Sequence, residues 1–218
     1  MARKRVAILI SGRGANMGAL IAAAKEPDYP AEIVLVLSNR PEAGGLRRAS
    51  AEGIATVVVD HTDFGKDREA FERAVQAHLE SHGIDIVCLA GFMRLFTASF
   101  VSRWNGRMIN VHPALLPSFK GLHTHERALE AGVKIHGATV HFVIPEVDSG
   151  PIIAQAAVPV HDDDDEARLA ERILAAEHRL YPMAVRLFAE GRLCIRGDRV
   201  AISGAVPPEI ALFNPAGG

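Results

Sequence analysis

The sequence predicts an α/β fold with a doubly wound, mostly parallel, Rossmann-like sheet, helices on both faces and an antiparallel C-terminal extension. Apolar runs and helical stretches alternate along the chain, which is the pattern of βαβ units with right-handed crossovers. The later apolar runs lie too close together for a crossover helix, so we expect them to pair antiparallel. The expected strands are residues 6–10, 33–38, 56–59, 85–90, 108–111, 137–143 and 152–158.

The composition of each run sets the expected environment of its strand. Residues 6–10 are continuously apolar between charged residues and a glycine-rich turn, as in a strand buried on both faces of a parallel sheet. Residues 137–143 alternate instead, which predicts a strand with one polar face. A hairpin is expected at residues 193–195 and 200–202, before a Pro/Gly-rich tail that we expect to be mobile.

Helices are expected between the strands from apolar stripes and capping signals. Phe71, Val75 and Leu79 recur every four positions, as on the buried side of a helix that faces a sheet. The acidic run 162–166 should complement the dipole of the last helix, with Asp165 or a neighbour as its cap. The expected helices are residues 17–25, 44–52, 68–82, 126–131 and 166–190.

One acidic side chain falls on the apolar stripe of the last helix. Glu177 lies four residues after Ile173, in line with Leu169 and Leu180. An inward carboxylate needs a partner, which is either a buried cation or a ligand hydroxyl.

Composition limits the possible partners. The chain has 218 residues, 49% of them hydrophobic and 23% charged, which fits a single globular domain over residues 1–218. The net charge of −2 offers no basic surface for nucleic acid, and the apolar run at residues 6–10 is too short for a membrane span or a signal peptide. We therefore expect a cytoplasmic protein with small-molecule partners, without a nucleic-acid or membrane partner, and either a monomer or a homodimer.

The two cysteines agree with this expectation. Cys88 lies within an apolar run, as a core thiol does, and Cys194 is also flanked by apolar residues. Neither cysteine has zinc-ligand spacing. The pair His123 and His125 could begin a metal site, but no other ligand-type cluster supports one, so we expect no metal.

A glycine-rich loop follows the first expected strand. Ser11-Gly12-Arg13-Gly14-Ala15-Asn16 comes directly before a helix, where backbone N–H groups and the helix dipole can hold a phosphate. Its spacing matches neither the dinucleotide fingerprint nor a P-loop, which leaves a monophosphate as the candidate ligand. A tight turn with purely structural glycines is the alternative.

The loop after the fourth expected strand is unusually apolar. Phe92, Met93 and Phe96 stand where a solvated loop is expected, together with Arg94. Ligands of doubly wound sheets bind beyond the carboxyl ends of the strands, so this loop could form a wall for a flat organic ligand. A small hydrophobic cluster beneath a long loop is the alternative.

Three polar residues at strand ends form the candidate catalytic group. Asn110 and His112 come from the segment Asn110-Val111-His112-Pro113, and Asp148 from Val147-Asp148-Ser149-Gly150-Pro151. An amide, an imidazole and a carboxylate can together stabilise an oxyanion and move a proton during transfer chemistry at a carbonyl.

These motifs, taken in order, resemble the folate-dependent formyltransferases, and within them the enzymes that act on phosphoribosylglycinamide (GAR). The resemblance covers nearly the whole chain. It is carried by Ile10-Ser11-Gly12, Ala90-Gly91-Phe92-Met93-Arg94, Asn110 to Pro117, Gly121-Leu122-His123-Thr124-His125, residues 137–142, Asp148-Ser149-Gly150-Pro151 and Glu177-His178. It implies transfer of the formyl group of 10-formyltetrahydrofolate, as co-substrate, to the amine of GAR.

The resemblance also implies roles for particular residues. Asn110, His112 and Asp148 correspond to the catalytic trio of the family, and Glu177 to the acid that holds the ribose hydroxyls. The implied phosphate cradle is Arg13, Gly14, Ala15 and Asn16. The implied folate pocket is Arg68, Phe92, Met93, Arg94, Leu95, Val101, Val143, Ile144 and Val147.

One departure concerns the cradle. Relatives commonly have serine at the position of Ala15, so this chain lacks any hydroxyl-to-phosphate bond there. The cradle must then depend on backbone N–H groups, Asn16 and the helix terminus.

The resemblance further divides the chain by function. Residues 1–100 would form the phosphate- and GAR-binding half, residues 101–190 the catalytic and folate-binding half, and residues 191–218 a small hairpin and tail. In the implied reaction, Asn110 and a protonated His112 donate hydrogen bonds to the formyl oxygen, while Asp148 orients His112 and accepts the amine proton.

Rival functions share some of these features. A formyltetrahydrofolate hydrolase, or a formyltransferase acting on methionyl-tRNA or an amino sugar, would use the same trio. The phosphate loop, the short chain and the lack of a basic C-terminal domain count against them. A non-catalytic nucleotide-binding module would leave the apolar loop around Met93 and the inward Glu177 unexplained.

Overall fold

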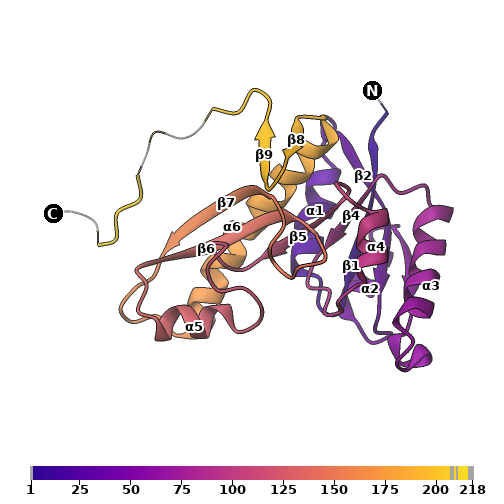
Figure 1. The fold of residues 1–218 in the computed structure, drawn as a ribbon, viewed down its shortest axis with the longest axis horizontal. Coiled ribbons are helices and arrows are strands. Elements are labelled where there is room, and N and C mark those ends of the chain that lie inside the picture. Colours follow the sequence, from indigo (N-terminus) through magenta and orange to yellow (C-terminus); the bar gives the residue numbers. More distant parts are fainter. Residues whose placement is uncertain (1, 207–208, 210, 216–218) are drawn as a thin grey trace. The chain divides into compact units, whose positions relative to one another are not determined.

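A computed structural model describes residues 2–206, 209 and 211–215. The chain forms two compact units (Figure 1). Unit 1 comprises Met1–Asn110 and Phe142–Pro145, and unit 2 comprises Val111–His141 and Glu146–Gly218. The assignment of separate functions to the two halves of the chain stays a prediction.

Unit 1 is the doubly wound half of the fold. Its strands pair in parallel in the order β3-β2-β1-β4-β5, which confirms the predicted parallel sheet. The elements are β1 (Lys4–Ile10), α1 (Ala15–Ala24), β2 (Ala31–Ser38), α2 (Gly44–Ala51), β3 (Ala55–Val58), the 3-10 helix η1 (His61–Phe64), α3 (Arg68–Ser81), β4 (Ile86–Leu89), α4 (Ala98–Arg103) and β5 (Met108–His112), whose last two residues belong to unit 2.

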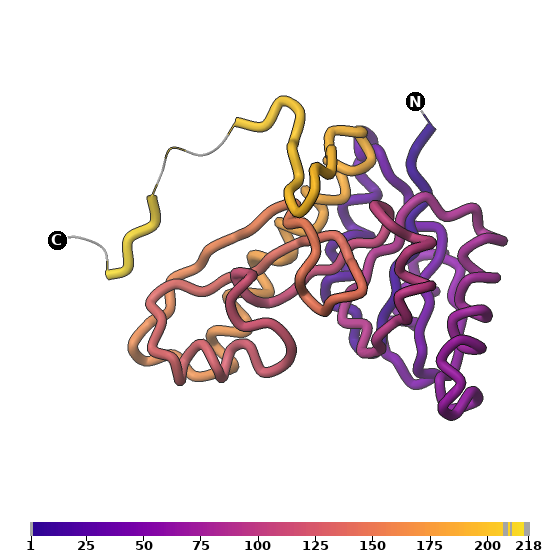
Figure 2. The backbone as a smooth tube through the Cα atoms, viewed as in Figure 1, coloured from indigo at the N-terminus to yellow at the C-terminus, as the bar shows by residue number. Residues whose placement is uncertain are grey.

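The core of unit 1 explains why β1 is continuously apolar. Each residue from Val6 to Ile10 has no exposed surface, because side chains on both faces of the strand are covered. On one face, Ala7 and Leu9 pack in a cluster with Phe71, Val75 and Leu79 of α3 and with Phe100 of α4. The predicted stripe of α3 is therefore confirmed as a buried stripe. The helices α3 and α4 run side by side (Figure 2).

The sequence did not predict α4 or η1. Helix α4 has only six residues, too few for an apolar stripe to repeat. Its signals are local: the Thr97 side chain accepts a hydrogen bond from the Phe100 N–H, and Asp60 caps η1 by accepting from the Thr62 N–H. The loop expected around Phe92 to Phe96 is confirmed, and α4 begins just beyond it at Ala98.

Unit 2 contains the antiparallel part of the fold. Strands β6 and β7 pair antiparallel, as do β8 and β9, and both pairings were expected. A single parallel bridge from Ile152 to Arg199 joins β7 to β9. The elements are α5 (Thr124–Glu130), β6 (Ile135–Phe142, whose last residue belongs to unit 1), β7 (Ile152–Pro159), α6 (Glu166–Ala189), β8 (Leu193–Arg196) and β9 (Arg199–Ile202).

The polar face predicted for β6 is not solvated. Thr139 and His141, the polar residues of that face, are both at most 2% exposed. Thr139 shows why a polar residue is stable there, because its hydroxyl donates to the Ala114 carbonyl (2.6 Å) and accepts from the Leu116 N–H (3.0 Å). The polar side of β6 therefore anchors the segment that follows β5.

The long helix α6 begins and packs as the sequence predicts. The Asp165 side chain accepts from the Arg168 N–H (2.8 Å), and Leu169, Ile173 and Leu180 are buried. Asp164 is also structural, since the Arg172 guanidinium holds the pKa of that carboxyl down at about 2.

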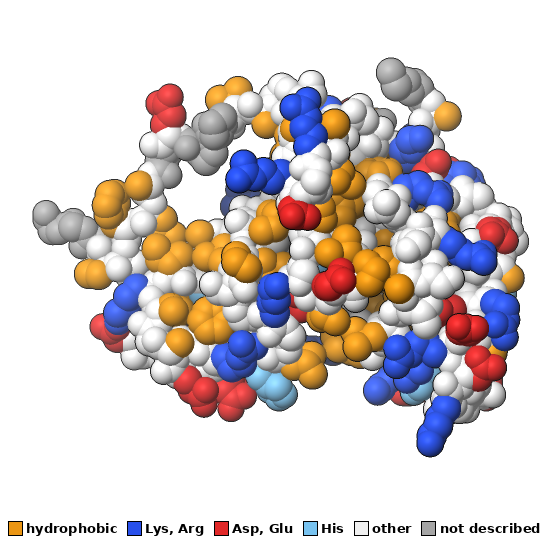
Figure 3. All heavy atoms as spheres, in the orientation of Figure 1, with side chains coloured by type: hydrophobic (Ala, Val, Ile, Leu, Met, Phe, Trp, Pro, Cys, Tyr) orange, Lys and Arg blue, Asp and Glu red, His pale blue; other side chains and the backbone are white. Residues whose placement is uncertain are grey.

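The visible surface of the protein carries charges of both signs. Lys and Arg side chains are interspersed with Asp and Glu on the visible surface, so neither sign dominates it (Figure 3). Among the described helices, none is both long and apolar enough to cross a membrane. The predicted mobile tail lies partly outside the described residues.

Candidate active site

The glycine-rich loop of unit 1 ends at an open helix N-terminus. Gly14 precedes α1 with φ of 67° and ψ of 46°, the left-handed region in which glycine carries no steric cost. Within the described residues, no side chain caps α1 and its first turn holds no acid. The first N–H groups of α1 can therefore serve an anion, as the sequence predicts.

Residues of helix α2 hold the glycine-rich loop through hydrogen bonds to its backbone. The Gly45 N–H donates to the Gly12 carbonyl (3.0 Å), and Arg48 Nη1 lies 3.3 Å from the Arg13 carbonyl oxygen and 3.4 Å from that of Gly14. Gly45 permits the close approach, because a Cβ there would lie 2.5 Å from Ile10 Cδ1 and 3.2 Å from the Gly12 oxygen.

The apolar loop after β4 is partly wall and partly core. Phe92 is only 9% exposed, and its ring stacks on Phe96, which stacks in turn on Phe100. Met93 and Leu95 are 61% and 62% exposed. The aromatic rings thus stabilise the loop, and the two aliphatic side chains are the ones available to a ligand.

The other residues expected at the folate pocket differ in exposure. Arg68, the first residue of α3, is exposed, whereas Val101 of α4 is only 3% exposed. The Arg94 guanidinium lies 5.8 Å from the Phe71 ring centroid. Val143 and Ile144 are half-buried in unit 1, and Val147 of unit 2 is 49% exposed. Their roles toward folate stay predictions.

Unit 2 brings His112 and Asp148 together. His112 Nδ1 lies 3.5 Å from Asp148 Oδ2, and both side chains are at least nine-tenths buried. This separation suits an ion pair better than a direct hydrogen bond. Asp148 has a φ of 50°, and its Oδ2 accepts from the Gly121 N–H (2.9 Å). The turn therefore aims the carboxylate at a fixed place.

The other ring nitrogen of His112 is also engaged. Nε2 lies 3.0 Å from the Phe119 carbonyl oxygen, and Phe119 itself has a φ of 54°. A bulky residue in the left-handed region is an outlier that the surrounding structure must maintain. The Arg127 guanidinium, 5.7 Å from the Phe119 ring centroid, helps to hold it.

Asn110 stands two residues before His112 on β5. Side chains at positions i and i+2 of a strand point to the same side, so the amide and the imidazole share one face of β5. Asn110 is half-buried and belongs to unit 1.

The sequence reasoning missed His141. Its Nε2 lies 3.7 Å from Asp148 Oδ1, so the Asp148 carboxylate stands between two buried imidazoles. The signal that could have found it is the period of β6, which places His141 on the same side as Thr139. Without the antiparallel register, nothing in the sequence relates that side to Asp148.

Two further histidines lie behind the Phe119 segment. The His136 ring is 1% exposed and packs edge-on against the rings of Phe119 and His125. Burial lowers the pKa of His136 to about 4, with smaller contributions from His125 and His112. Burial also lowers the pKa of His125, against the attraction of Glu166. Both imidazoles are therefore neutral at pH 7.

Glu177 is buried, and the predicted histidine pair begins at the surface. Glu177 is 5% exposed, so the predicted inward orientation is confirmed, while its role toward a ribose stays a prediction. His123 lies at the surface, where its Nδ1 is 3.4 Å from Glu126 Oε2. In the described part of the chain, no group of three His, Cys, Asp or Glu side chains is arranged to hold a metal ion.

Comparison with known proteins now identifies the family. Residues 4–185 match the family described as formyl transferase. The chain belongs to the formyl transferase family. It is 42% identical over 205 residues to the phosphoribosylglycinamide formyltransferase of Escherichia coli, a match that covers 94% of this chain and 96% of that one. The resemblance inferred from the motifs is confirmed.

Other relatives show how the family domain is used. A solved phosphoribosylglycinamide formyltransferase from Brucella melitensis is 56% identical, covers 86% of this chain and 96% of its own, and superposes with a TM-score of 0.83. The human trifunctional purine biosynthetic protein adenosine-3 is 51% identical over 87% of this chain, which spans 19% of that protein. This formyl transferase thus corresponds to about a fifth of the trifunctional relative.

Proposed function

We propose that this formyl transferase carries the formyl group of 10-formyltetrahydrofolate to the amine of GAR in purine biosynthesis. The observation that carries the proposal is the buried pair of His112 and Asp148, 3.5 Å apart at the end of β5. A carbonyl transfer to a neutral amine needs a donor for the oxyanion and an acceptor for the amine proton, and this pair can supply both.

In the proposed reaction, the GAR amine attacks the formyl carbon and forms a tetrahedral intermediate. The carbonyl oxygen gains negative charge, and the Asn110 amide and the His112 imidazolium donate hydrogen bonds to it. Losing one such donor typically costs about 3 kcal/mol of transition-state stabilisation. The bond from the carbon to folate N10 then breaks and the formyl carbonyl re-forms. Asp148 accepts the amine proton directly or through water, and this proton passes to N10, which restores the Asp148 carboxylate.

The contacts of His112 add one condition to this mechanism. Nε2 lies 3.0 Å from the Phe119 carbonyl, so it must exchange that oxygen for the formyl oxygen before it can donate to the substrate. The left-handed Phe119 and Asp148 mark the two turns that hold the present arrangement. We infer that the segment around Phe119 shifts when the formyl donor binds.

The GAR phosphate is assigned to the N-terminus of α1. The uncapped N–H groups beyond Gly14, the Arg13 side chain and Asn16 make up the proposed cradle, and the backbone supplies the donors that Ala15 cannot. Glu177, buried on α6, is assigned to the ribose hydroxyls, which accords with its place on an otherwise apolar stripe.

The folate is assigned to the loop after β4 and to residues near it. Exposed Met93 and Leu95 offer apolar contact for the pterin, and Arg68 and Arg94 offer charge for the carboxylate tail. Phe92 and Val101 are so little exposed that they would act by supporting this surface. Val143 and Ile144 of unit 1 are assigned to the same folate surface, and Val147 of unit 2 is assigned as a further folate contact.

Dependence of the reaction on GAR tests the proposed function. We expect purified protein to convert 10-formyltetrahydrofolate to tetrahydrofolate only when GAR is present, with formyl-GAR formed in equal amount. Absorbance of the folate and mass spectrometry of the product measure the two. Folate turnover without GAR would indicate a hydrolase, and no turnover under any condition a binding module.

Ala15 provides a second test, directed at the phosphate cradle. We expect Ala15→Ser to lower the KM for GAR by roughly threefold to tenfold, because a new hydroxyl can donate to the phosphate. The KM for the formyl donor should stay the same. Ala24→Ser, at the other end of α1, is the matched control and should change neither value. An unchanged GAR KM in Ala15→Ser would argue against a phosphate at this helix end.

We further propose that the reaction takes place in the cytoplasm. Cys194 is a free, exposed thiol. Exposed free thiols are typical of reducing compartments.

A further inference from the structure

We propose that the Ser11 hydroxyl is a positioning group that holds the folate-binding loop in register with the start of the phosphate loop. The inference rests on the proposed function for the identity of the two loops. Ser11 is 8% exposed and stands between β1 and the Gly12–Asn16 segment. It is neither a catalytic residue nor a substrate ligand in the mechanism above.

Three hydrogen bonds converge on Ser11. Its backbone N–H donates to the Gly91 carbonyl (3.1 Å), and its Oγ accepts from the Met93 N–H (2.7 Å). The hydroxyl proton is donated to Asn39 Oδ1 at 2.5 Å. The Asn39 side chain is itself 1% exposed, so this chain of bonds is shielded from water. Ser11 therefore holds two points of the loop after β4, Gly91 through its backbone N–H and Met93 through its hydroxyl.

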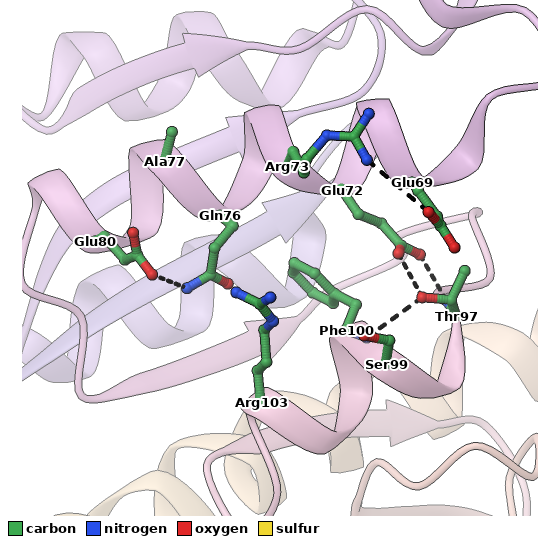
Figure 4. Close-up of a pocket in the computed structure, with 10 residues that line it drawn as sticks. All are labelled: Glu69, Glu72, Arg73, Gln76, Ala77, Glu80, Thr97, Ser99, Phe100 and Arg103. Carbon is green, nitrogen blue, oxygen red and sulfur yellow. Dashed lines mark hydrogen bonds and ion pairs between the residues drawn. The ribbon is translucent and has the colours of Figure 1, made fainter.

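The far end of the same loop is fixed independently. Glu72 of α3 is 5% exposed, and its carboxylate accepts from the Thr97 N–H and the Thr97 hydroxyl, both at 2.5 Å. These bonds lie at the edge of a groove of about 270 Å³ between α3 and α4 (Figure 4). The loop is thus held at Met93 by Ser11 and at Thr97 by Glu72.

The spacing of the two anchors explains how an exposed apolar segment stays in place. The Met93 and Leu95 side chains of this segment are mostly exposed. Apolar side chains at a surface would otherwise collapse onto the protein. A loop fixed at both ends presents them without that collapse, which lowers the entropy cost of binding a flat ligand.

Only the Ser11 anchor also adjoins the phosphate loop. Gly12, the next residue, accepts from the Gly45 N–H, and Gly14 begins α1. Loss of the Ser11 hydroxyl should therefore disturb both loops, whereas loss of the Glu72 charge should disturb the folate loop alone. This asymmetry separates positioning by Ser11 from general stabilisation of unit 1.

The direct test compares Ser11→Ala with wild type by amide hydrogen exchange, followed residue by residue with NMR. We expect the Met93 amide to exchange at least about tenfold faster in Ser11→Ala, because a buried donor loses its acceptor. Asn39→Ala, which removes the acceptor of the Ser11 hydroxyl proton, should act in the same direction by a smaller factor. Unchanged Met93 exchange in both variants would overturn the proposal.

Steady-state kinetics measure the consequence for the two substrates. In Ser11→Ala we expect the KM for 10-formyltetrahydrofolate to rise roughly tenfold and that for GAR to rise by a smaller factor, with kcat within about threefold of wild type. Glu72→Gln should raise only the folate KM. A purely structural role for Ser11 would lower the unfolding temperature and leave both KM values unchanged, which would contradict the proposal.

Control measurements keep this result separate from the proposed function. Ser81→Ala removes a hydroxyl that bonds within α3 and should leave Met93 exchange and both KM values unchanged. The exchange experiment needs no substrate. If wild type lacked GAR-dependent turnover, the proposed function would fail while the exchange data still decided whether Ser11 holds the loop.

Discussion

Asp148→Asn is expected to lower kcat by about a thousandfold, within the range of roughly 10²–10⁴ for loss of general acid–base catalysis. The amide keeps the shape of the carboxylate and an oxygen that can accept from the Gly121 N–H, so the turn at Asp148 should persist. It cannot accept the amine proton, and it no longer provides the negative charge beside His112 and His141. Single-turnover kinetics with GAR and formyl donor at saturation measure the loss.

Binding measurements separate this catalytic loss from misfolding. Calorimetric titration with GAR should give a Kd within about threefold of wild type, because the groups assigned to the phosphate and the ribose, residues 13–16 and Glu177, do not include Asp148. Asp198→Asn, at the exposed turn between β8 and β9, removes the same charge from unit 2 and should leave kcat unchanged. A kcat for Asp148→Asn within tenfold of wild type would refute the assigned role.

The sequence evidence for the candidate trio is local. Asn110 and His112 share a strand, and Asp148 sits in a Gly/Pro-containing turn, so residue type and spacing are visible in a short stretch. His141 escapes the same reasoning, because only the register of β6 places it against Asp148. The anchors of the loop after β4 escape it too. Ser11 and Glu72 act on residues 82 and 25 positions away.

The fold shows the same division between local and non-local information. Strand β1 is apolar on both faces from Val6 to Ile10, and the burial of this stretch can be predicted from composition alone. The polar side of β6 misleads, because alternation normally indicates a solvated face. Thr139 can be buried because its hydroxyl donates to the Ala114 carbonyl and accepts from the Leu116 N–H. Both partners belong to a segment without regular secondary structure.

The buried His136 leads to the second large effect, a loss of stability in mild acid. Burial holds its pKa at about 4 in the folded protein, against about 6.5 in an unfolded chain. As the pH falls, the unfolded chain therefore takes up the proton first. Above about pH 7, His136 therefore does not change the free energy of unfolding with pH. Below pH 6.5, proton uptake by the unfolded chain lowers this free energy progressively, and below pH 4 the decrease levels off.

His136→Phe isolates this effect. Phenylalanine has a similar shape and suits the ring contacts with Phe119 and His125, but it cannot bind a proton. Between pH 7.5 and pH 4, we expect wild type to lose about 3 kcal/mol more unfolding free energy than His136→Phe. Urea unfolding at a series of pH values measures the difference. His78→Gln, on α3 of unit 1, is the control for removal of a histidine that does not contact Phe119 or His125.

The position of His136 makes the result informative about the site as well. Its ring packs on Phe119, whose carbonyl engages His112 Nε2, so a proton on His136 places a charge directly behind that contact. Wild type should then lose the order of the Phe119 segment, seen as faster amide exchange, at a higher pH than His136→Phe does. Parallel stability and exchange profiles of the two proteins down to pH 4 would contradict the assignment of the acid sensitivity to His136.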